Sequence, residues 1–130
     1  MSKTAFKNVQ FVNCKLLGLQ FHICNDFLFE INIDSCILNL SSFYKLKLKN
    51  TVFKNSTLHE VDFTQADLTA SVFNHCDLLD ATFDASIIEK ADFRTAYNYT
   101  IDLEINRAKK AKFSQSGIAG LLTKYGIELY

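Results

Sequence analysis

Residues 51–95 divide into nine blocks of five residues, which read TVFKN, STLHE, VDFTQ, ADLTA, SVFNH, CDLLD, ATFDA, SIIEK and ADFRT. The third residue of every block is large and apolar, and the first is small or aliphatic. An α-helix repeats about every 3.6 residues and a simple strand about every 2, so neither matches this pattern. The chain must therefore change direction once in every block.

The large apolar positions form a track that extends beyond this stretch. Fourteen consecutive members, each five residues after the last, are Leu28, Ile33, Leu38, Phe43, Leu48, Phe53, Leu58, Phe63, Leu68, Phe73, Leu78, Phe83, Ile88 and Phe93. A second, small track lies two residues before them and includes Ile31, Cys36, Ser41, Thr51, Ser56, Val61, Ala66, Ser71, Cys76, Ala81, Ser86 and Ala91. If both tracks point inward, four blocks close one square coil, and successive coils stack about 4.8 Å apart as a solenoid.

Sorting the large track in steps of twenty residues tests the four-sided coil. The columns read Ile33, Phe53, Phe73, Phe93; then Leu38, Leu58, Leu78; then Phe43, Phe63, Phe83; and Leu28, Leu48, Leu68, Ile88. Phenylalanine columns on two opposite sides alternate with aliphatic columns on the other two. We therefore predict an all-β solenoid in which rings stack from coil to coil.

The N-terminal part of the chain keeps the period with one interruption. Phe6, Phe11, Leu16 and Phe21 are five residues apart, but Leu28 follows Phe21 by seven. Two extra residues are therefore expected to bulge outward near residues 25–27.

Downstream of Phe93 the period is expected to continue in weaker form. Asn98 and Leu103 then occupy the large track, and Phe113 ends it. We assign residues 1–113 to the solenoid and residues 114–130 to a separate C-terminal module.

The C-terminal module predicts a short α-helix that covers the open end of the solenoid. Ser114 is a candidate N-cap, and Gly126 a candidate end. An uncovered end would expose unpaired backbone and apolar side chains. Because Gly117 and Gly120 leave small surfaces, we also expect this end to pair with a second copy, whereas a monomeric cap is the alternative. The candidate dimer interface comprises Ile118, Leu121, Leu122, Tyr125, Leu129 and Tyr130.

Charge is balanced overall but segregated along the chain. Fourteen basic and fourteen acidic residues give a net charge of zero, so the whole chain shows no bias toward nucleic acid or membrane. Residues 57–93 nevertheless carry a net charge of −7, between flanking segments of +4 and +3. Glu60, Asp62, Asp80 and Asp84 form a candidate docking belt for a basic partner. The alternative is that Asp is simply a common outward residue of this repeat.

Other residue types give no sign of catalytic, metal or cofactor chemistry. Cys14, Cys24, Cys36 and Cys76 lack zinc or redox spacing and are interpreted as compact core residues. The histidines, which are His22, His59 and His75, all fall on outward positions. His59, Glu60 and Asp62 come closest to an acid–base cluster, but on a convex surface without a pocket. We therefore expect no catalytic site, no metal site and no cofactor.

A basic run and the short apolar segments bear on contacts with nucleic acid and membrane. Arg107, Lys109, Lys110 and Lys112 form a basic run, for which a solvated surface is favoured over a phosphate contact. Apolar runs are short, and the first residues lack the apolar core of a secretion signal, so a cytoplasmic location and no membrane contact are expected.

Three blocks carry a family resemblance: Ala66-Asp67-Leu68, Cys76-Asp77-Leu78 and Ala91-Asp92-Phe93. Together with the period, they resemble the pentapeptide-repeat family over residues 4–113. The resemblance implies a right-handed quadrilateral β-helix and a non-catalytic scaffold that binds an unidentified protein partner.

Residues 106–114 and the helix after them also resemble the C-terminal module of the quinolone-resistance branch of that family. Members of that branch dimerise through this module and bind DNA gyrase or topoisomerase IV as mimics of duplex DNA. The resemblance therefore implies an alternative function, a homodimeric DNA mimic whose partner is a type II topoisomerase, with no direct nucleic-acid contact. This chain differs in being short and in having no net charge.

Overall fold

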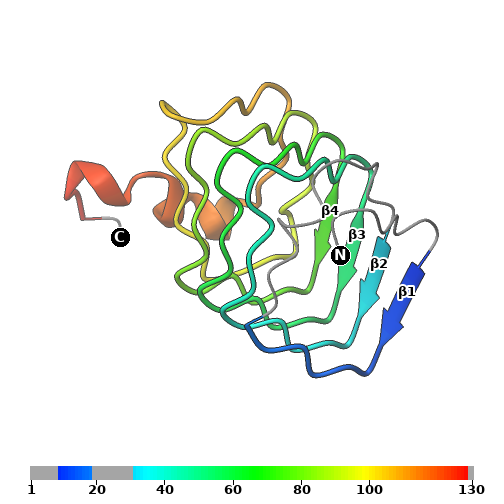
Figure 1. Ribbon diagram of the computed structural model, residues 1–130. Coiled ribbons are helices and arrows are strands. Elements are labelled where there is room, and N and C mark those ends of the chain that lie inside the picture. The colour runs from blue at the N-terminus through cyan, green and yellow to red at the C-terminus, as the bar shows by residue number, and fades with distance from the viewer. Residues whose placement is uncertain (1–8, 19–30, 129–130) are drawn as a thin grey trace.

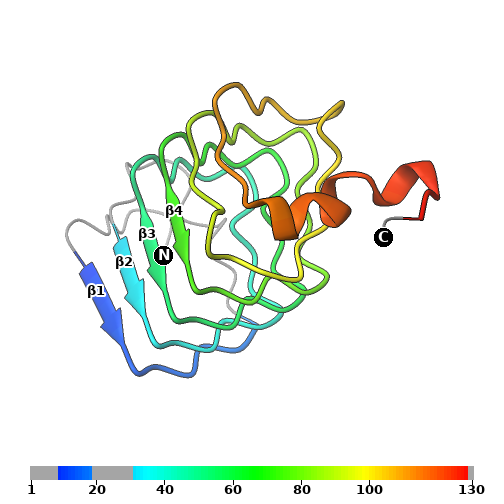
Figure 2. The ribbon, with the colours of Figure 1, turned by 180° about the vertical axis from the view of Figure 1, so that it is seen from behind.

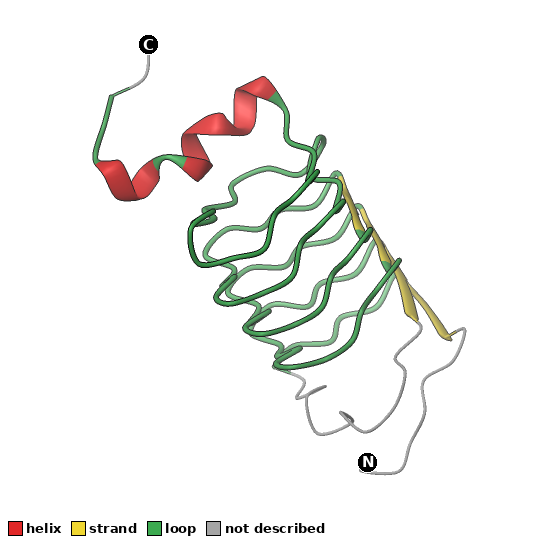
Figure 3. Cartoon of the chain, turned by 90° about the horizontal axis from the view of Figure 1, so that it is seen from above, coloured by secondary structure: helices red, strands yellow, loops and turns green. Residues whose placement is uncertain are grey.

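The computed structural model describes residues 9–18 and 31–128, and it shows a right-handed quadrilateral β-helix with a helical C-terminal end (Figure 1). Its coils stack along one axis, with strands aligned on one side and helices across the C-terminal end (Figure 3). The elements are β1 (Val9–Val12), β2 (Ile31–Asp34), β3 (Val52–Lys54), β4 (Val72–Asn74), η2 (Gln115–Leu121) and η3 (Thr123–Tyr125). No helix in the described ranges has the length and apolar character needed to cross a bilayer.

The four strands form one parallel sheet in the order β1-β2-β3-β4, which both ribbon views show (Figures 1 and 2). Ile33 is the register partner of Phe53, and Phe53 that of Phe73, so the offset is twenty residues. Phe11 pairs with Ile33, an offset of twenty-two residues. The first described coil is thus two residues longer, while the expected bulge at residues 25–27 lies outside the described residues.

We name the four sides of the rod after the buried residues of one coil, residues 51–70. In chain order they are the Phe53, Leu58, Phe63 and Leu68 sides. Isolated parallel bridges twenty residues apart, such as Ser42 with Asp62 and Lys47 with Asp67, continue the pairing on the sides without regular strands. Each side therefore presents an outward ladder of side chains with one rung per coil.

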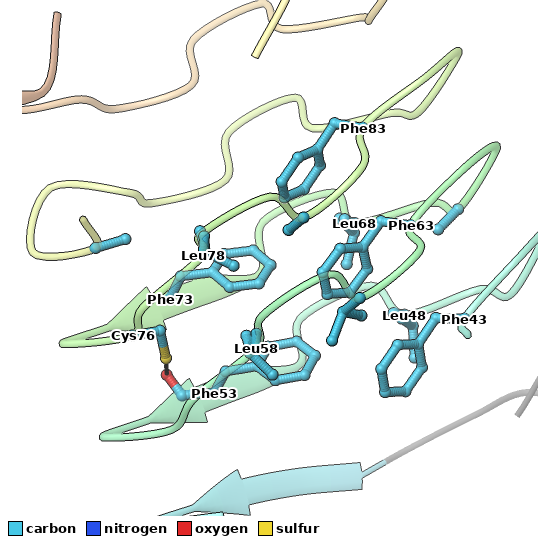
Figure 4. Packing of buried hydrophobic residues seen from close by; sticks show 14 of the residues in the cluster. Phe43, Leu48, Phe53, Leu58, Phe63, Leu68, Phe73, Cys76, Leu78 and Phe83 are labelled. Atoms are coloured by element: carbon cyan, nitrogen blue, oxygen red, sulfur yellow. Dashed lines mark hydrogen bonds between the residues drawn. The ribbon is translucent and has the colours of Figure 1, made fainter. Parts of the chain in front are cut away.

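The large track fills the interior as predicted. Every member from Ile33 to Phe93 is buried, with at most 5% of its surface exposed. The rings of Phe53 and Phe73 lie 4.9 Å apart and nearly parallel, and those of Phe73 and Phe93 lie 4.8 Å apart. Phe63 and Phe83 stack at 5.1 Å on the opposite side. Figure 4 shows these two phenylalanine columns with the leucine columns between them.

The small track supplies hydrogen-bond donors as well as space. The Ser71 hydroxyl donates to the Leu48 carbonyl at 2.6 Å, and the Cys76 thiol donates to the Phe53 carbonyl at 3.3 Å (Figure 4). In both cases the acceptor is a large-track residue of the previous coil. A small side chain with one donor therefore fills the corner of the coil and satisfies a second acceptor position of a buried carbonyl.

The corners explain the period of five. The residue two after each large residue from Ile33 to Ile88 has left-handed backbone, for example Glu60, Ala70 and Lys90 with φ of 58°, 58° and 60°. Backbone bonds to the next coil hold these residues in place, as when the Leu40 amide donates to the His59 carbonyl at 2.9 Å. The coil-to-coil bonding thus stabilises a conformation that non-glycine residues adopt at a cost of about 1–2 kcal/mol each.

The predicted continuation of the large track past Phe93 is wrong at Asn98 and Leu103. Asn98 has φ of 61° and is exposed, and Leu103 is 43% exposed. Tyr99 enters the core instead and is only 4% exposed. The twenty-residue register nevertheless resumes with Ile87 paired to Arg107, so this side loops out without gaining or losing residues.

Asn106 repairs the hydrogen bonding where the loop leaves the coil. Its Oδ1 accepts from the Ser86 amide at 2.8 Å, and its Nδ2 donates to the Phe83 and Asp102 carbonyls at 2.9 and 2.8 Å. An amide at this small-track position therefore satisfies three backbone groups, which a serine or cysteine hydroxyl or thiol cannot do.

The C-terminal module is helical as expected, but its turns are 3-10 rather than α-helical. The Ser114 side chain accepts from the Gly117 amide, and Gly126 ends the last turn with φ of 63°, so both predicted caps are present. Gly117 and Gly120 lower helix propensity within a short segment, which favours short 3-10 turns over a regular α-helix.

Gly117 and Gly120 allow close contact within the chain. A Cβ at 117 would lie 1.8 Å from the Tyr99 hydroxyl, and one at 120 would lie 2.0 Å from the Tyr99 carbonyl oxygen. Leu121 packs against the same core. The module therefore covers the end of the solenoid, as predicted from the need to shield it.

Replacing a stacked ring tests the inward assignment of the large track. Phe73→Ala should lower the free energy of unfolding by about 3–5 kcal/mol, because it leaves a cavity between two rings. Lys54→Ala, an exposed position on the same side, should cost less than about 0.5 kcal/mol. Urea titration measures both, and equal destabilisation would show that inward and outward positions have been confused.

Candidate interaction surfaces

Four acidic residues lie on two neighbouring parts of the rod, a corner and the side that follows it. Glu60 and Asp80 occupy the corner between the Leu58 and Phe63 sides, and the Glu60 amide donates to the Leu79 carbonyl, which stacks the two corners. Asp62 and Asp84 lie on the adjoining Phe63 side in neighbouring coils. We call Glu60, Asp62, Asp80 and Asp84 the acidic edge. Among the described residues, none of the four has an ion-pair partner.

The residues of the acidic edge differ in their exposure and hydrogen bonding. Asp62 is half-buried and accepts a hydrogen bond from the Thr64 amide at 2.9 Å. Glu60, Asp80 and Asp84 are exposed. The edge therefore offers a partner three exposed carboxylates and one half-buried carboxylate that is held by a backbone amide.

A second polar cluster lies on the Leu58 side and was missed by sequence reasoning. His59 Nε2 lies 2.6 Å from Asp77 Oδ2, while Asp77 Oδ1 accepts from the Leu79 amide and from Asn98 Nδ2 at 3.2 and 3.0 Å. The sequence had grouped His59 with Glu60 and Asp62. The sequence does contain a signal for this pair. His59 directly follows Leu58, and Asp77 directly precedes Leu78, which lies in the same column one coil later. The two residues therefore lie on the same side.

The pKa of Asp77 reflects this bonding. Burial alone would raise it, but hydrogen bonds from His59, Asn98 and the Leu79 amide outweigh burial, so the pKa lies below its ordinary value. His59, Asp77 and Asn98 come from three successive coils. We therefore interpret the cluster as a clamp between coils.

The C-terminal module is fastened to the looped-out side by a charged clasp. Lys124 binds the carboxylates of Asp102 and Glu104, and the Tyr125 hydroxyl donates to Glu104 Oε1 at 3.1 Å. The hydrogen bond from Lys124, with that from Tyr125, holds the pKa of Glu104 below its usual range. The clasp thus fixes η3 beside residues 102–104.

The predicted dimer interface is only partly available on this module. Ile118 and Tyr125 are 41% and 53% exposed, whereas Leu121 packs against the core and Leu122 is half-buried. Leu129 and Tyr130 lie outside the described residues. Other exposed apolar side chains near this end of the chain are Leu103, Ile105 and Ile127.

The described cysteines behave as core residues. Cys36 and Cys76 are buried, and burial raises the pKa of the Cys76 thiol to about 12. Cys14 is half-buried, and Cys24 lies outside the described residues. Within residues 9–18 and 31–128, no three His, Cys, Asp or Glu side chains come together in a way that could hold a metal ion.

Two open hollows on the described surface are lined by polar side chains. One of about 270 Å³ is lined by Asn32, Asp34 and Lys54 among others, and one of about 350 Å³ lies against Asn74, Arg94 and Thr95. Both lie on the Phe53 side. Arg94 is paired with Asp92 at 2.9 Å, and the Thr95 hydroxyl donates to Asn74. In the second hollow, the polar groups therefore bond to one another.

A sequence model of the pentapeptide repeat region matches residues 4–93. This chain belongs to the pentapeptide-repeat family. The resemblance noted from the repeat blocks is thereby confirmed. Among proteins of curated function, none matches the sequence.

Solved structures matched to this family member include three with low sequence identity and low TM-scores. Rfr23 from the cyanobacterium Cyanothece 51142 is 14% identical, with a TM-score of 0.33, over 82% of this chain and 88% of that one. HetL from Nostoc sp. strain PCC 7120, involved in heterocyst differentiation regulation, is 12% identical, with a TM-score of 0.43, over 86% and 62%. Full-length QnrB1, a plasmid-mediated fluoroquinolone resistance protein, is 13% identical, with a TM-score of 0.32, over 91% and 100%. At these values the comparisons carry no functional conclusion.

The clamp on the Leu58 side makes stability depend on pH. Because the pKa of folded Asp77 is lowered, the clamp stabilises the fold above the ordinary aspartate value of about 4 and is lost as the pH falls through the folded value. Asp77→Asn should cost roughly 1 kcal/mol at neutral pH and less in acid. The control is Asp80→Asn, at an exposed corner. The free energy of unfolding is measured by urea titration from neutral to acidic pH. If it depended on pH in the same way for Asp77→Asn as for the wild type, the result would contradict the clamp.

Proposed function

We infer that this chain is a non-catalytic scaffold that binds another macromolecule through its outward side-chain ladders. The acidic edge carries this proposal, because its four carboxylates are held in register by two coils and have no ion-pair partner among the described residues. The interior is filled by the large track, so chemistry is confined to a convex surface that does not exclude water. We place the protein in the cytoplasm, without direct contact to nucleic acid or membrane.

The partner we propose presents a short basic patch. Glu60 and Asp62 lie on one coil and Asp80 and Asp84 on the next, so four charges fall within two coils of about 4.8 Å rise. Fixed carboxylates of one sign attract a basic surface and orient it during encounter. Exposed ion pairs contribute about 0.2–1 kcal/mol each, so the edge supplies orientation more than affinity.

A type II topoisomerase is the second candidate partner, with the chain acting as a DNA mimic. The acidic edge favours it, together with the resemblance of residues 106–114 to the quinolone-resistance branch. Duplex DNA carries one charge per about 1.7 Å of axis, and the acidic edge approaches this density over only about 10 Å. The short length of the edge therefore ranks a basic patch on another protein above a long mimic of the duplex.

Homodimerisation through the C-terminal module completes the proposal. Ile118 and Tyr125 supply exposed apolar surface, and Leu103, Ile105 and Ile127 are also exposed. Burying such side chains against a second copy is favourable by about 25 cal/mol per Å² of apolar area. The clasp of Lys124 with Asp102 and Glu104 keeps η3 in place for this contact.

Neutralising the acidic edge tests the scaffold function. Affinity capture from the native host should recover a basic protein with the wild type and lose it with Glu60→Gln/Asp80→Asn, because the variant removes two carboxylates without changing the core. Asp34→Asn/Glu89→Gln removes the same charge on other sides and should keep the partner. A purified DNA gyrase supercoiling assay over a salt series tests the second candidate directly.

Identical capture by all three proteins would contradict a role for the acidic edge. Supercoiling unaffected by a large molar excess of wild-type protein would remove the topoisomerase candidate. The two outcomes are independent, since a partner other than gyrase can depend on the same edge.

A further inference from the structure

A basic strip lies on the corner opposite the acidic edge. Lys90 and Lys110 occupy the corner between the Leu68 and Phe53 sides, with φ of 60° and 62°. The Lys90 amide donates to the Lys109 carbonyl at 3.0 Å, which stacks the two corners as in Glu60 and Asp80. We call Lys90, Lys109 and Lys110 the basic edge. All three are exposed, and no residue in the described part of the chain forms an ion pair with them.

The adjoining Leu68 side has an excess of positive charge. Lys47, Lys49 and Arg107 point outward there, and its outward acids in these coils are Asp67 and Glu89. Lys49 lies 3.8 Å from Asp67, and Arg107 lies 3.4 Å from Glu89, so both acids are already paired. The basic edge is therefore not neutralised by its own side.

The acidic and basic edges are diagonally opposite because the four sides follow one another in chain order. The first corner follows the Leu58 side and the second follows the Leu68 side, half a coil later. Glu60 and Lys90 are thirty residues apart, or one and a half coils, which is an axial distance of roughly 7 Å. Each edge has two corner residues one coil apart. The two edges therefore carry opposite charges, have the same one-coil spacing between their corner residues, and face in opposite directions.

We propose that a second copy of this chain docks side by side, with its basic edge against the acidic edge of the first. The acidic edge is that of the proposed function, and the second copy is an additional occupant for it. A diagonal translation with an axial shift of roughly 7 Å places Lys90 and Lys110 of one copy opposite Glu60 and Asp80 of the other. Rotation is not needed, because diagonal corners face opposite directions.

Charge balance favours a second copy over a polyanion. A nucleic acid or an anionic membrane would gain from the basic edge, but the chain as a whole has no net charge to attract it. A second copy uses both edges at once. Translation leaves one edge free at each end, so the contact is heterologous and extends into an open array.

The expected contact depends on salt. Exposed ion pairs are weak, and screening acts over about 30 Å at 10 mM salt but about 10 Å at 100 mM. We expect association at low ionic strength that disappears at about 300 mM salt. Any C-terminal dimer, which is apolar, persists at high salt and is thereby measured separately.

Charge reversal with complementation tests the proposal. Sedimentation equilibrium at about 10 mM salt should show wild-type mass rising with concentration above the high-salt value. Glu60→Lys/Asp80→Lys alone and Lys90→Glu/Lys110→Glu alone should each lose this rise, because their edges then repel. An equimolar mixture of the two variants should regain it, since each supplies the edge that the other lacks. Lys15→Glu/Lys54→Glu is the control for the second pair.

The outcomes separate this proposal from the proposed function. Docking between edges would be overturned if the mixture kept the mass that is measured at high salt. It would also be overturned if Lys15→Glu/Lys54→Glu lost the rise in mass as completely as Lys90→Glu/Lys110→Glu. Capture of a basic partner could still succeed in that case. Retention of a short DNA duplex by the wild type, abolished by Lys90→Glu/Lys110→Glu, would assign the basic edge to nucleic acid instead.

Discussion

Backbone hydrogen bonds between residues about twenty apart are the constraint on which the rest of this structure depends. The Leu58 amide donates to the Asp77 carbonyl at 2.9 Å, and the Thr57 amide donates back to Cys36 of the preceding coil at 2.9 Å. A fixed register places like residues above one another, so rings stack on rings inside. The same register spaces outward side chains by one coil. Core stability and surface pattern thus have one cause.

The C-terminal end shows what happens when one side leaves that register. Asn98 and Leu103 turn outward, and Tyr99 enters the core, where its ring lies 5.9 Å from that of Phe93 and 5.6 Å from that of Phe113. Asn106 satisfies the backbone groups left by the loop. Gly117 and Gly120 then let η2 approach Tyr99 closely. Together, these irregular residues end the solenoid. They also position the exposed apolar residues that are proposed for dimerisation.

Most of the fold could be predicted because a period of five and columns of twenty leave few alternatives. The phenylalanine columns and the buried cysteines follow from position in the block. Tyr99 could not be predicted, because the choice between positions 98 and 99 depends on η2 packing, which the repeat does not encode. The His59–Asp77 pair could be predicted only by comparing residues that directly follow a large-track residue with residues that directly precede one. The 3-10 geometry of the cap was not expected from its apolar spacing, because Gly117 and Gly120 lower the helix propensity of this short segment.

Function then rests on surfaces that the register aligns, and the register itself is open to direct measurement. A double-mutant cycle of Phe53→Leu and Phe73→Leu measures the coupling of two rings predicted to stack. The twenty-residue register predicts a coupling of about 0.5–1.5 kcal/mol for this pair, and additivity within about 0.5 kcal/mol for Phe53→Leu with Phe93→Leu, whose rings lie two coils apart. Additivity for Phe53 and Phe73, or equal coupling for both pairs, would contradict the twenty-residue register.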